Sequence, residues 1–240
     1  MQKNSMKRYY HLIIQIISLL FLLDGCYDKG NLVYDGSQIN TILSYYYEVA
    51  FGSEFTEDYS YIRKWNDDVK IFLPDNSFDE LNNELNKIIN EINALSSTTK
   101  LYIVESQKES NFIIYLGDKD TYVQKYESQA RTYVEDNWGL FWIYWNDNYE
   151  IYSGSMYVDI YRTDDIECQK HLLREELTQS LGLMNDSNKY PKSIFYDRWE
   201  CTTEFLEIDE QLIRIHLSTN IKSGMTKNNV TKIISHGKIY

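Results

Sequence analysis

Residues Cys168–Ser187 read CQKHLLREELTQSLGLMNDS, and the rest of the chain is best interpreted around them. Three leucines recur every four residues and predict one apolar stripe along a helix: Leu173, Leu177 and Leu181. Three polar residues recur with the same spacing on another face: His171, Glu175 and Gln179. We therefore expect an amphipathic helix with one buried face and one polar face. Gly182 follows the stripe, at the position where helices commonly end on glycine.

The segments on either side predict an α+β domain. Alternating or β-branched apolar runs predict strands at 69–73, 101–104, 112–116, 139–145 and 155–162. A long helix is expected over 81–95, with Ser77 and Glu80 as its capping box. Further helices are expected over 37–50, from Phe205 to Ile215, and from about Thr226 onward, whereas 117–137 is polar and shows no clear period. This order predicts a mixed sheet with a long helix, a central helix and a C-terminal helix.

The length and net charge of the chain indicate its domain organisation and exclude one class of partner. With 240 residues and 43% hydrophobic composition, the chain is expected to form a single domain over 37–240, in which 37–63 is a helical lead-in. The net charge of −12, from 36 acidic and 24 basic side chains, argues against a nucleic-acid partner because phosphate binding needs a basic surface.

The N-terminus has the layout of a secretory signal. Three basic residues precede a short apolar run over 12–23, which favours a cleaved signal over a membrane-spanning helix. The following residues Leu23-Asp24-Gly25-Cys26 resemble the bacterial lipobox, with Asp24 where a small or apolar residue is usual. We expect a lipoprotein signal peptide over 1–25, lipidation of Cys26 with fatty acyl chains such as palmitate, and a tether over 26–36. The chain would then be a membrane-anchored lipoprotein of the bacterial cell envelope; the alternative is a secreted protein with a chance cysteine.

Two cysteines remain beyond the signal. Cys168 and Cys201 bracket the central helix and the loop behind it. In an oxidising envelope such a pair predicts a disulfide, and the alternative is a pair of buried thiols.

The central segment resembles the metzincin branch of the zincin peptidases. Residues 175–183, EELTQSLGL, stand where the motif H-E-x-x-H-x-x-G would lie, with Glu175 and Gln179 in place of the two histidines. Residues 193–196, SIFY, resemble the Met-turn with phenylalanine for methionine, and 207–215 resemble the helix that closes such a domain. More specifically, the segments REELTQSLGLMNDS, SIFYD and SGMT resemble a bacterial lipoprotein family called domain of unknown function two-nine-two-seven.

The zincin resemblance assigns a role to each motif position. Glu176 falls on the general base, whereas Glu175 and Gln179 fall on the two helix ligands and Asn185, beside Asp186, on the third. His171 and Glu175 form an alternative pair of ligands, although Leu172 would then occupy the position of the base. We expect no cofactor, because amides are poor zinc ligands. If a divalent ion binds through Glu175, Glu176 and Asp186, these oxygen donors would suit calcium, magnesium or manganese better.

The functional expectation is a zincin-like domain that has lost the usual zinc site. Without that site it would act as a binding or scaffold module, anchored to the membrane, for an envelope protein or peptide. In that case Glu176 and Gln179 would bond the Asn185-Asp186 loop, in a polar network where the metal would lie. The alternatives are an atypical metallohydrolase or peptidase with Glu176 as general base, and a purely structural surface lipoprotein.

Overall fold

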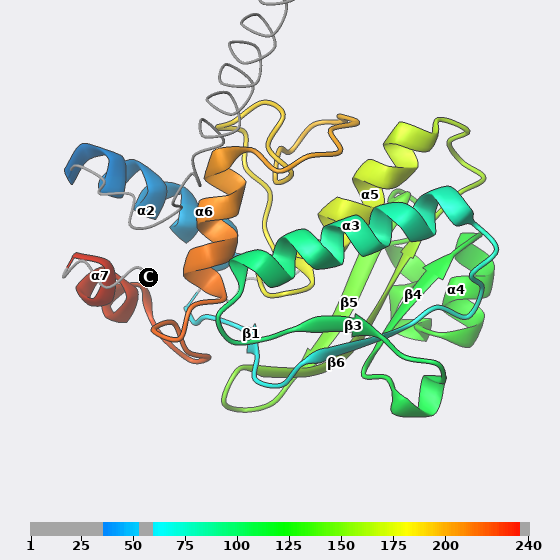
Figure 1. The fold of residues 1–240 in the computed structure, drawn as a ribbon, viewed down its shortest axis with the longest axis horizontal. Coiled ribbons are helices and arrows are strands. Elements are labelled where there is room, and N and C mark those ends of the chain that lie inside the picture. The colour runs from blue at the N-terminus through cyan, green and yellow to red at the C-terminus, as the bar shows by residue number, and fades with distance from the viewer. Residues whose placement is uncertain (1–35, 53–59, 236–240) are drawn as a thin grey trace, which may run out of the picture. The chain divides into compact units, whose positions relative to one another are not determined.

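A computed structural model of the chain describes residues 36–52 and 60–235 (Figure 1). Its centre is a mixed sheet of β1 (Lys64–Trp65), β2 (Val69–Phe72), β3 (Leu101–Ile103), β4 (Phe112–Leu116), β5 (Gly139–Trp145) and β6 (Glu150–Val158). The order across the sheet is β3-β2-β4-β6-β5, and β1 pairs with the first residues of β6. All pairs are parallel except β5 with β6. Among the strands in residues 36–52 and 60–235, the one antiparallel strand, β5, therefore lies at an edge of the sheet.

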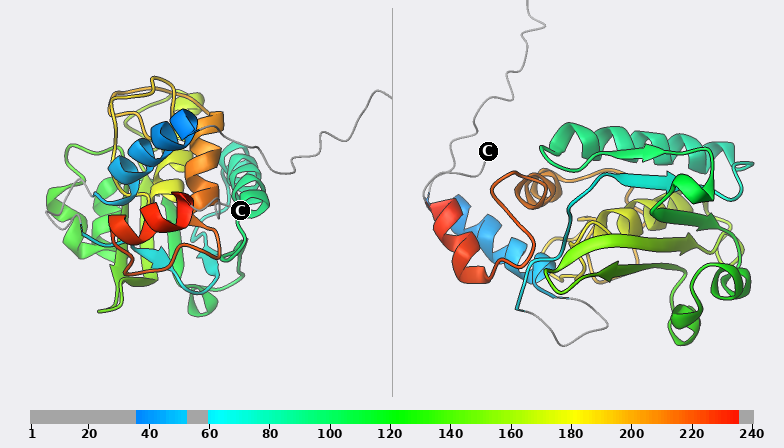
Figure 2. Two further views of the ribbon diagram at one scale, coloured as in Figure 1. Left: turned by 90° about the vertical axis from the view of Figure 1, so that its left-hand side faces the viewer. Right: turned by 90° about the horizontal axis from the view of Figure 1, so that it is seen from below.

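Two helices, α3 (Asp79–Leu95) and α5 (Ile166–Gln179), pack against each other and against the sheet (Figures 1 and 2). The apolar spacing of α3 buries one full stripe: Leu81, Leu85, Ile88, Ile89, Ile92 and Leu95. Its contacts reach β3, whereas those of α5 reach β5 and β6. The central helix thus packs against the sheet at its antiparallel edge.

Side chains on the opposite face of β5 and β6 pack against a second cluster. Leu140 and Tyr157 contact residues of α4 (Lys119–Lys125) and of the short helix η2 (Ser128–Thr132), and the Tyr122 hydroxyl bonds Ser155 Oγ at 2.9 Å. Because side chains alternate along a strand, Gly139 and Phe141 lie on the face that carries α5. A Cβ added to Gly139 would meet both Leu172 and Glu176 of α5.

Three helices, α2 (Gly36–Ala50), α6 (Glu207–His216) and α7 (Lys227–Ser235), form a separate helical group beside the sheet (Figure 2). Consecutive tyrosines of α2 join it to different parts of the chain. Tyr45 bonds Ser193 Oγ at 2.7 Å, Tyr46 bonds His216 Nδ1 at 3.0 Å, and Tyr47 bonds Thr231 Oγ1 at 2.5 Å. The tyrosine run therefore joins α2 to the loop after α5 and to both C-terminal helices.

The α+β class and the expected order of elements are confirmed. Two local predictions are wrong. The strand expected at 155–162 lies at Glu150–Val158, because the Asp159 carboxylate accepts the N–H groups of Tyr161 and Arg162 and turns the chain. The capping box at Ser77 does not form, because α3 has no side-chain cap and the Ser77 N–H donates to Asp75.

The segment 117–137, which has no clear period in the sequence, holds α4 and η2. Within the described residues, none of the helices combines the length and apolarity needed to cross a bilayer. The expected signal peptide, lipidated Cys26 and most of the tether lie outside those residues.

Candidate functional site

A cleft of about 850 Å³ lies between α5 and the antiparallel edge of the sheet. Its floor is α5, one wall is the start of β5 with Trp138, and the other wall is the loop segment 196–199. Seven carboxylates line it: Asp136, Asp164, Asp165, Glu175, Glu176, Asp186 and Asp197. Four aromatic side chains do so as well: Trp138, Phe141, Tyr196 and Trp199. The cleft thus combines acidic and aromatic surface along a strand edge.

The sequence of α5 explains how its polar residues reach the cleft. The Asp165 carboxylate caps the helix by accepting the Glu167 N–H at 3.0 Å. Leu173 and Leu177 are fully buried on the core side, and Leu181, one residue past the C-cap, is buried too. Burial of these leucines leaves the face with the predicted polar residues toward the cleft.

His171 and Glu175 form one polar pair on the floor. His171 Nε2 lies 3.3 Å from Glu175 Oε2, and its Nδ1 lies 2.8 Å from the carbonyl oxygen of Thr202. Burial alone would lower the pKa of His171, but the hydrogen bond and negative charge of Glu175 outweigh it and raise the pKa above 6.5. The imidazole thus bridges the helix and the chain just beyond the loop wall, so both of its nitrogens have partners.

Gln179 and Asp186 form a second pair. The Gln179 side-chain nitrogen donates to Asp186 Oδ1 at 2.6 Å, which is the Gln179 part of the polar network expected in place of a metal. Asn185 is not part of the cleft lining. Its side-chain nitrogen donates to the carbonyl oxygen of Glu48 at 3.1 Å, so this amide belongs to the contact with α2.

Glu176, the candidate general base, lines the cleft and is 8% exposed. Its side chain lies against Gly139 at the start of β5, where a Cβ would come within 2.7 Å of Glu176 Oε1. Glycine at this position therefore lets the carboxylate approach the strand edge.

The residues of the floor do not fit a zinc site. Across 36–52 and 60–235, no three His, Cys, Asp or Glu side chains are grouped so as to hold a metal ion. The carbonyl oxygen of Gln179 would be an uncharged ligand, and the amide nitrogen already occupies Asp186. The candidate ligands are divided between the pairs His171–Glu175 and Gln179–Asp186, so we derive no reaction step through a metal.

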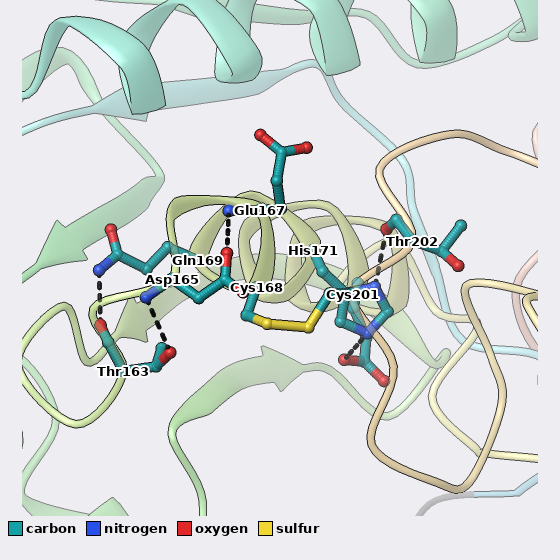
Figure 3. The surroundings of a disulfide bond; sticks show 9 residues. Thr163, Asp165, Glu167, Cys168, Gln169, His171, Cys201 and Thr202 are labelled. Carbon is teal, nitrogen blue, oxygen red and sulfur yellow. Dashed lines mark hydrogen bonds and ion pairs between the residues drawn. A yellow bond between two sulfur atoms is a disulfide. The ribbon is translucent and has the colours of Figure 1, made fainter.

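The loop wall is tied covalently to the floor. Figure 3 shows the disulfide between Cys168 on α5 and Cys201 in the loop, which are 33 residues apart in sequence. The contact of His171 with Thr202 lies one residue beyond it. The disulfide pairing expected from the sequence is thus present in the structure, and it fixes the position of the wall next to Trp199.

The SIFY segment anchors the start of the loop wall to α6. Phe195 is fully buried, and the Ser193 hydroxyl donates to Asp209 Oδ1 of α6 at 2.5 Å. The same carboxylate accepts the N–H groups of Ile194 and Leu206 at 3.2 and 2.9 Å. This segment is therefore a structural turn, tied to α6, that leads into the loop wall.

A family comparison covers nearly the whole described chain. Residues 40–236 match the model of the family described as "Protein of unknown function (DUF2927)". The chain belongs to this family. The DUF2927 match includes the floor and both walls of the cleft. No curated protein matches the chain.

Sequence reasoning had identified the floor of the DUF2927 cleft but not its walls. Trp138, Phe141 and Trp199 carry no motif, and the aromatic run FWIYW at 141–145 was interpreted only as a strand. The sequence shows these aromatic residues but not that β5 lies at the edge of the sheet, because that position depends on how all the strands pair.

Proposed function

We propose that the cleft binds an extended polypeptide segment, so that the domain is a binding module. The observation that carries the proposal is the outer edge of β5. Among the described strands, β6 is the only one that pairs with β5, and Gly139, Leu140 and Phe141 line the cleft on the outer side. An extended peptide can add to such an edge through main-chain hydrogen bonds.

The register of the β5–β6 pair identifies the backbone groups that would bind. Asp159 N–H donates to the Trp138 carbonyl at 2.7 Å, so this pair is hydrogen-bonded. Hydrogen-bonded and non-hydrogen-bonded pairs alternate along an antiparallel ladder. The non-hydrogen-bonded pairs include Gly139 with Val158 and Phe141 with Met156. The N–H and C=O groups of Gly139 and Phe141 therefore point toward the cleft.

The test removes one outward N–H without disturbing the sheet. A displayed library of random decapeptides is panned on the domain, and the selected peptides are measured by fluorescence anisotropy against Phe141→Pro and Phe141→Ala. Proline is tolerated at an edge position that makes no ladder bond. We expect Phe141→Pro to weaken binding about tenfold more than Phe141→Ala, which keeps the N–H, as one lost main-chain hydrogen bond is worth about 1.5 kcal/mol.

Ile143→Pro compared with Ile143→Ala is the matched control, because Ile143 is also a non-hydrogen-bonded position but does not line the cleft. The Ile143 side chain is buried, so the alanine variant accounts for the lost packing. The two Ile143 variants should bind the selected peptides equally. Failure to select any peptide, or equal binding by both Phe141 variants, would contradict the proposal. The same protein, prepared with zinc, tests the alternative. Stoichiometric zinc with peptide cleavage that Glu176→Gln abolishes would instead make the domain a metallohydrolase.

We also propose that the module is attached to a bacterial envelope membrane through lipidated Cys26. The charged start, the short apolar run and Gly25-Cys26 support this anchor, as does a disulfide that suits an oxidising compartment. Two acyl chains anchor a protein stably where one is marginal. Fractionation should place the wild type in the membrane and Cys26→Ser in the soluble fraction.

A further inference from the structure

We infer that the segment bound in the cleft is cationic, with a lysine or arginine side chain held against Trp199. This inference rests on the proposed function and names the chemistry of the partner. It is carried by the charge of the cleft, by the exposed tryptophan at its loop wall, and by the alternation that an added strand would impose.

Negative charge prevails in the cleft. Its lining has seven carboxylates and two arginines, a formal charge of −5 with His171 counted as neutral and −4 with His171 protonated. Both arginines already have carboxylate partners. Arg162 Nε lies 2.7 Å from Asp159 Oδ2, and Arg198 Nε lies 4.0 Å from Asp197 Oδ1. Since Asp159 is 3% exposed and lies outside the lining, Arg162 adds little positive potential for a ligand. A basic segment complements this field.

Trp199 provides the aromatic surface. Its ring lies edge to face with Trp138, with centroids 5.0 Å apart and planes at 73°, so the loop wall and the strand wall meet at this point. Trp199 is nevertheless 56% exposed. A tryptophan face beside several carboxylates attracts a cation through its quadrupole as well as through charge. The fold already uses this contact internally, because the Arg174 guanidinium carbon lies 4.5 Å from the Phe205 ring centroid.

Strand addition sets the spacing of the basic residues. Successive side chains of an extended peptide point to opposite faces, so every second residue of a segment along β5 would point toward α5 and its carboxylates. A peptide with lysine at alternate positions should therefore bind best.

The experiment compares three labelled nonapeptides, TKTKTKTKT, TQTQTQTQT and TETETETET, by fluorescence anisotropy at low salt. We expect the lysine peptide to bind at least tenfold more tightly than the glutamine peptide, and the glutamate peptide not to bind. The double variant Asp136→Asn with Asp164→Asn should weaken binding of the lysine peptide about fivefold. Asp120→Asn with Asp147→Asn changes the net charge equally outside the cleft and should have an effect below twofold.

A matched pair of alanine variants tests the aromatic contact. Trp199→Ala should weaken binding of the lysine peptide about tenfold. Tyr152 is an equally exposed aromatic residue, at 56%, that lies outside the lining, so Tyr152→Ala should leave this binding unchanged.

Equal binding of the lysine and glutamine peptides would overturn the inference and leave the proposed function standing. Panned peptides without basic residues would do the same. Preferential binding of chitotetraose that is lost in Trp199→Ala would overturn it in favour of a neutral carbohydrate ligand. If neither the panned peptides nor the designed peptides bind, both the inference and the proposed function are wrong.

Discussion

Two histidines in this chain have pKa values shifted in opposite directions by their surroundings. His216 is fully buried between the Tyr46 hydroxyl and the carbonyl oxygen of Leu181, and burial together with the positive charge of Lys64 lowers its pKa to about 3. His171, beside Glu175, has a raised pKa. The first imidazole is therefore neutral in the fold at pH 7, and the second gains from being charged.

We predict that His216 makes the protein acid-sensitive. The unfolded imidazole takes up a proton near pH 6.5 and the folded one only near pH 3, so unfolding consumes a proton between these values. The free energy of unfolding should fall by about 1.4 kcal/mol per pH unit through this window because of His216. His216→Gln keeps a donor and an acceptor but does not titrate, so urea unfolding between pH 7 and pH 4 should show a shallower slope.

His171→Gln provides the opposite comparison. Because the folded pKa is raised, the stabilisation by His171 is complete below pH 6.5 and is lost as the pH rises through the folded value. The loss of stability in His171→Gln should therefore be largest at acidic pH and shrink above neutrality. Curves for both variants that run parallel to the wild type would contradict both assignments.

Neighbours along a helix could be predicted from the sequence, and distant partners could not. The proximity of His171 to Glu175 follows from helical spacing. The contact of Gln179 with Asp186 was expected because Gln179 is at the end of α5 and the 185–186 loop follows closely in sequence. His216 gives no such signal, because Tyr46 is 170 residues away and Leu181 is 35 residues away. Its role depends on the close approach at Gly182, whose φ of +113° and missing Cβ leave room for the Arg63 carbonyl and His216.

At the scale of elements, the contact between α3 and α5 contains a buried charge cluster. Arg174 is fully buried, donates to Glu84 Oε1 at 2.6 Å and also pairs with Glu91. Glu84 is 8% exposed, so its carboxylate depends on this partner. The two helices under the sheet are therefore joined by a salt bridge as well as by apolar packing.

We predict that Arg174→Ala lowers the free energy of unfolding by about 3–5 kcal/mol, because it leaves a buried carboxylate unpaired. Arg174→Met combined with Glu84→Leu should recover most of this loss by replacing the pair with apolar volume. Lys87→Ala is the control, since Lys87 and Glu204 are a surface pair 4.0 Å apart and should contribute less than about 0.5 kcal/mol. Chemical denaturation measures all three. A double variant no more stable than Arg174→Ala would argue against the electrostatic explanation.

Element identity was more predictable than element boundaries. The apolar periods of α3 and α6 are strongly amphipathic, so local pattern alone locates these helices. The leucine stripe also locates α5, although most of that helix is buried, including residues of its polar face. The end of β6 was misplaced because one side chain, Asp159, turns the chain within a continuing apolar alternation. The α4 segment was missed because it is short, and its burial of Tyr122 and Val123 follows from the sheet face it covers.

At the scale of the whole molecule, one covalent bond joins the helix under the sheet to the loop that forms the opposite wall. The Cys168–Cys201 link closes 33 residues. We predict that Cys168→Ser with Cys201→Ser lowers the free energy of unfolding by about 3–4 kcal/mol in the chain-entropy model. Denaturation of the double variant, and of the wild type with and without reductant, measures this. Free thiols at both positions in an unreduced digest would refute the pairing.

The same bond makes residues 168–201 a closed ring of peptide that contains the SIFY segment and all of the loop wall up to Trp199. Lys192 lies in that ring, exposed and with a left-handed φ of 74°. A protease that cut after Lys192 would open the ring without releasing a fragment. On a gel, the nicked chain would separate into two fragments only after reduction. Without reduction, the C-terminal fragment that carries Trp199 would remain bonded to α5 beside the cleft.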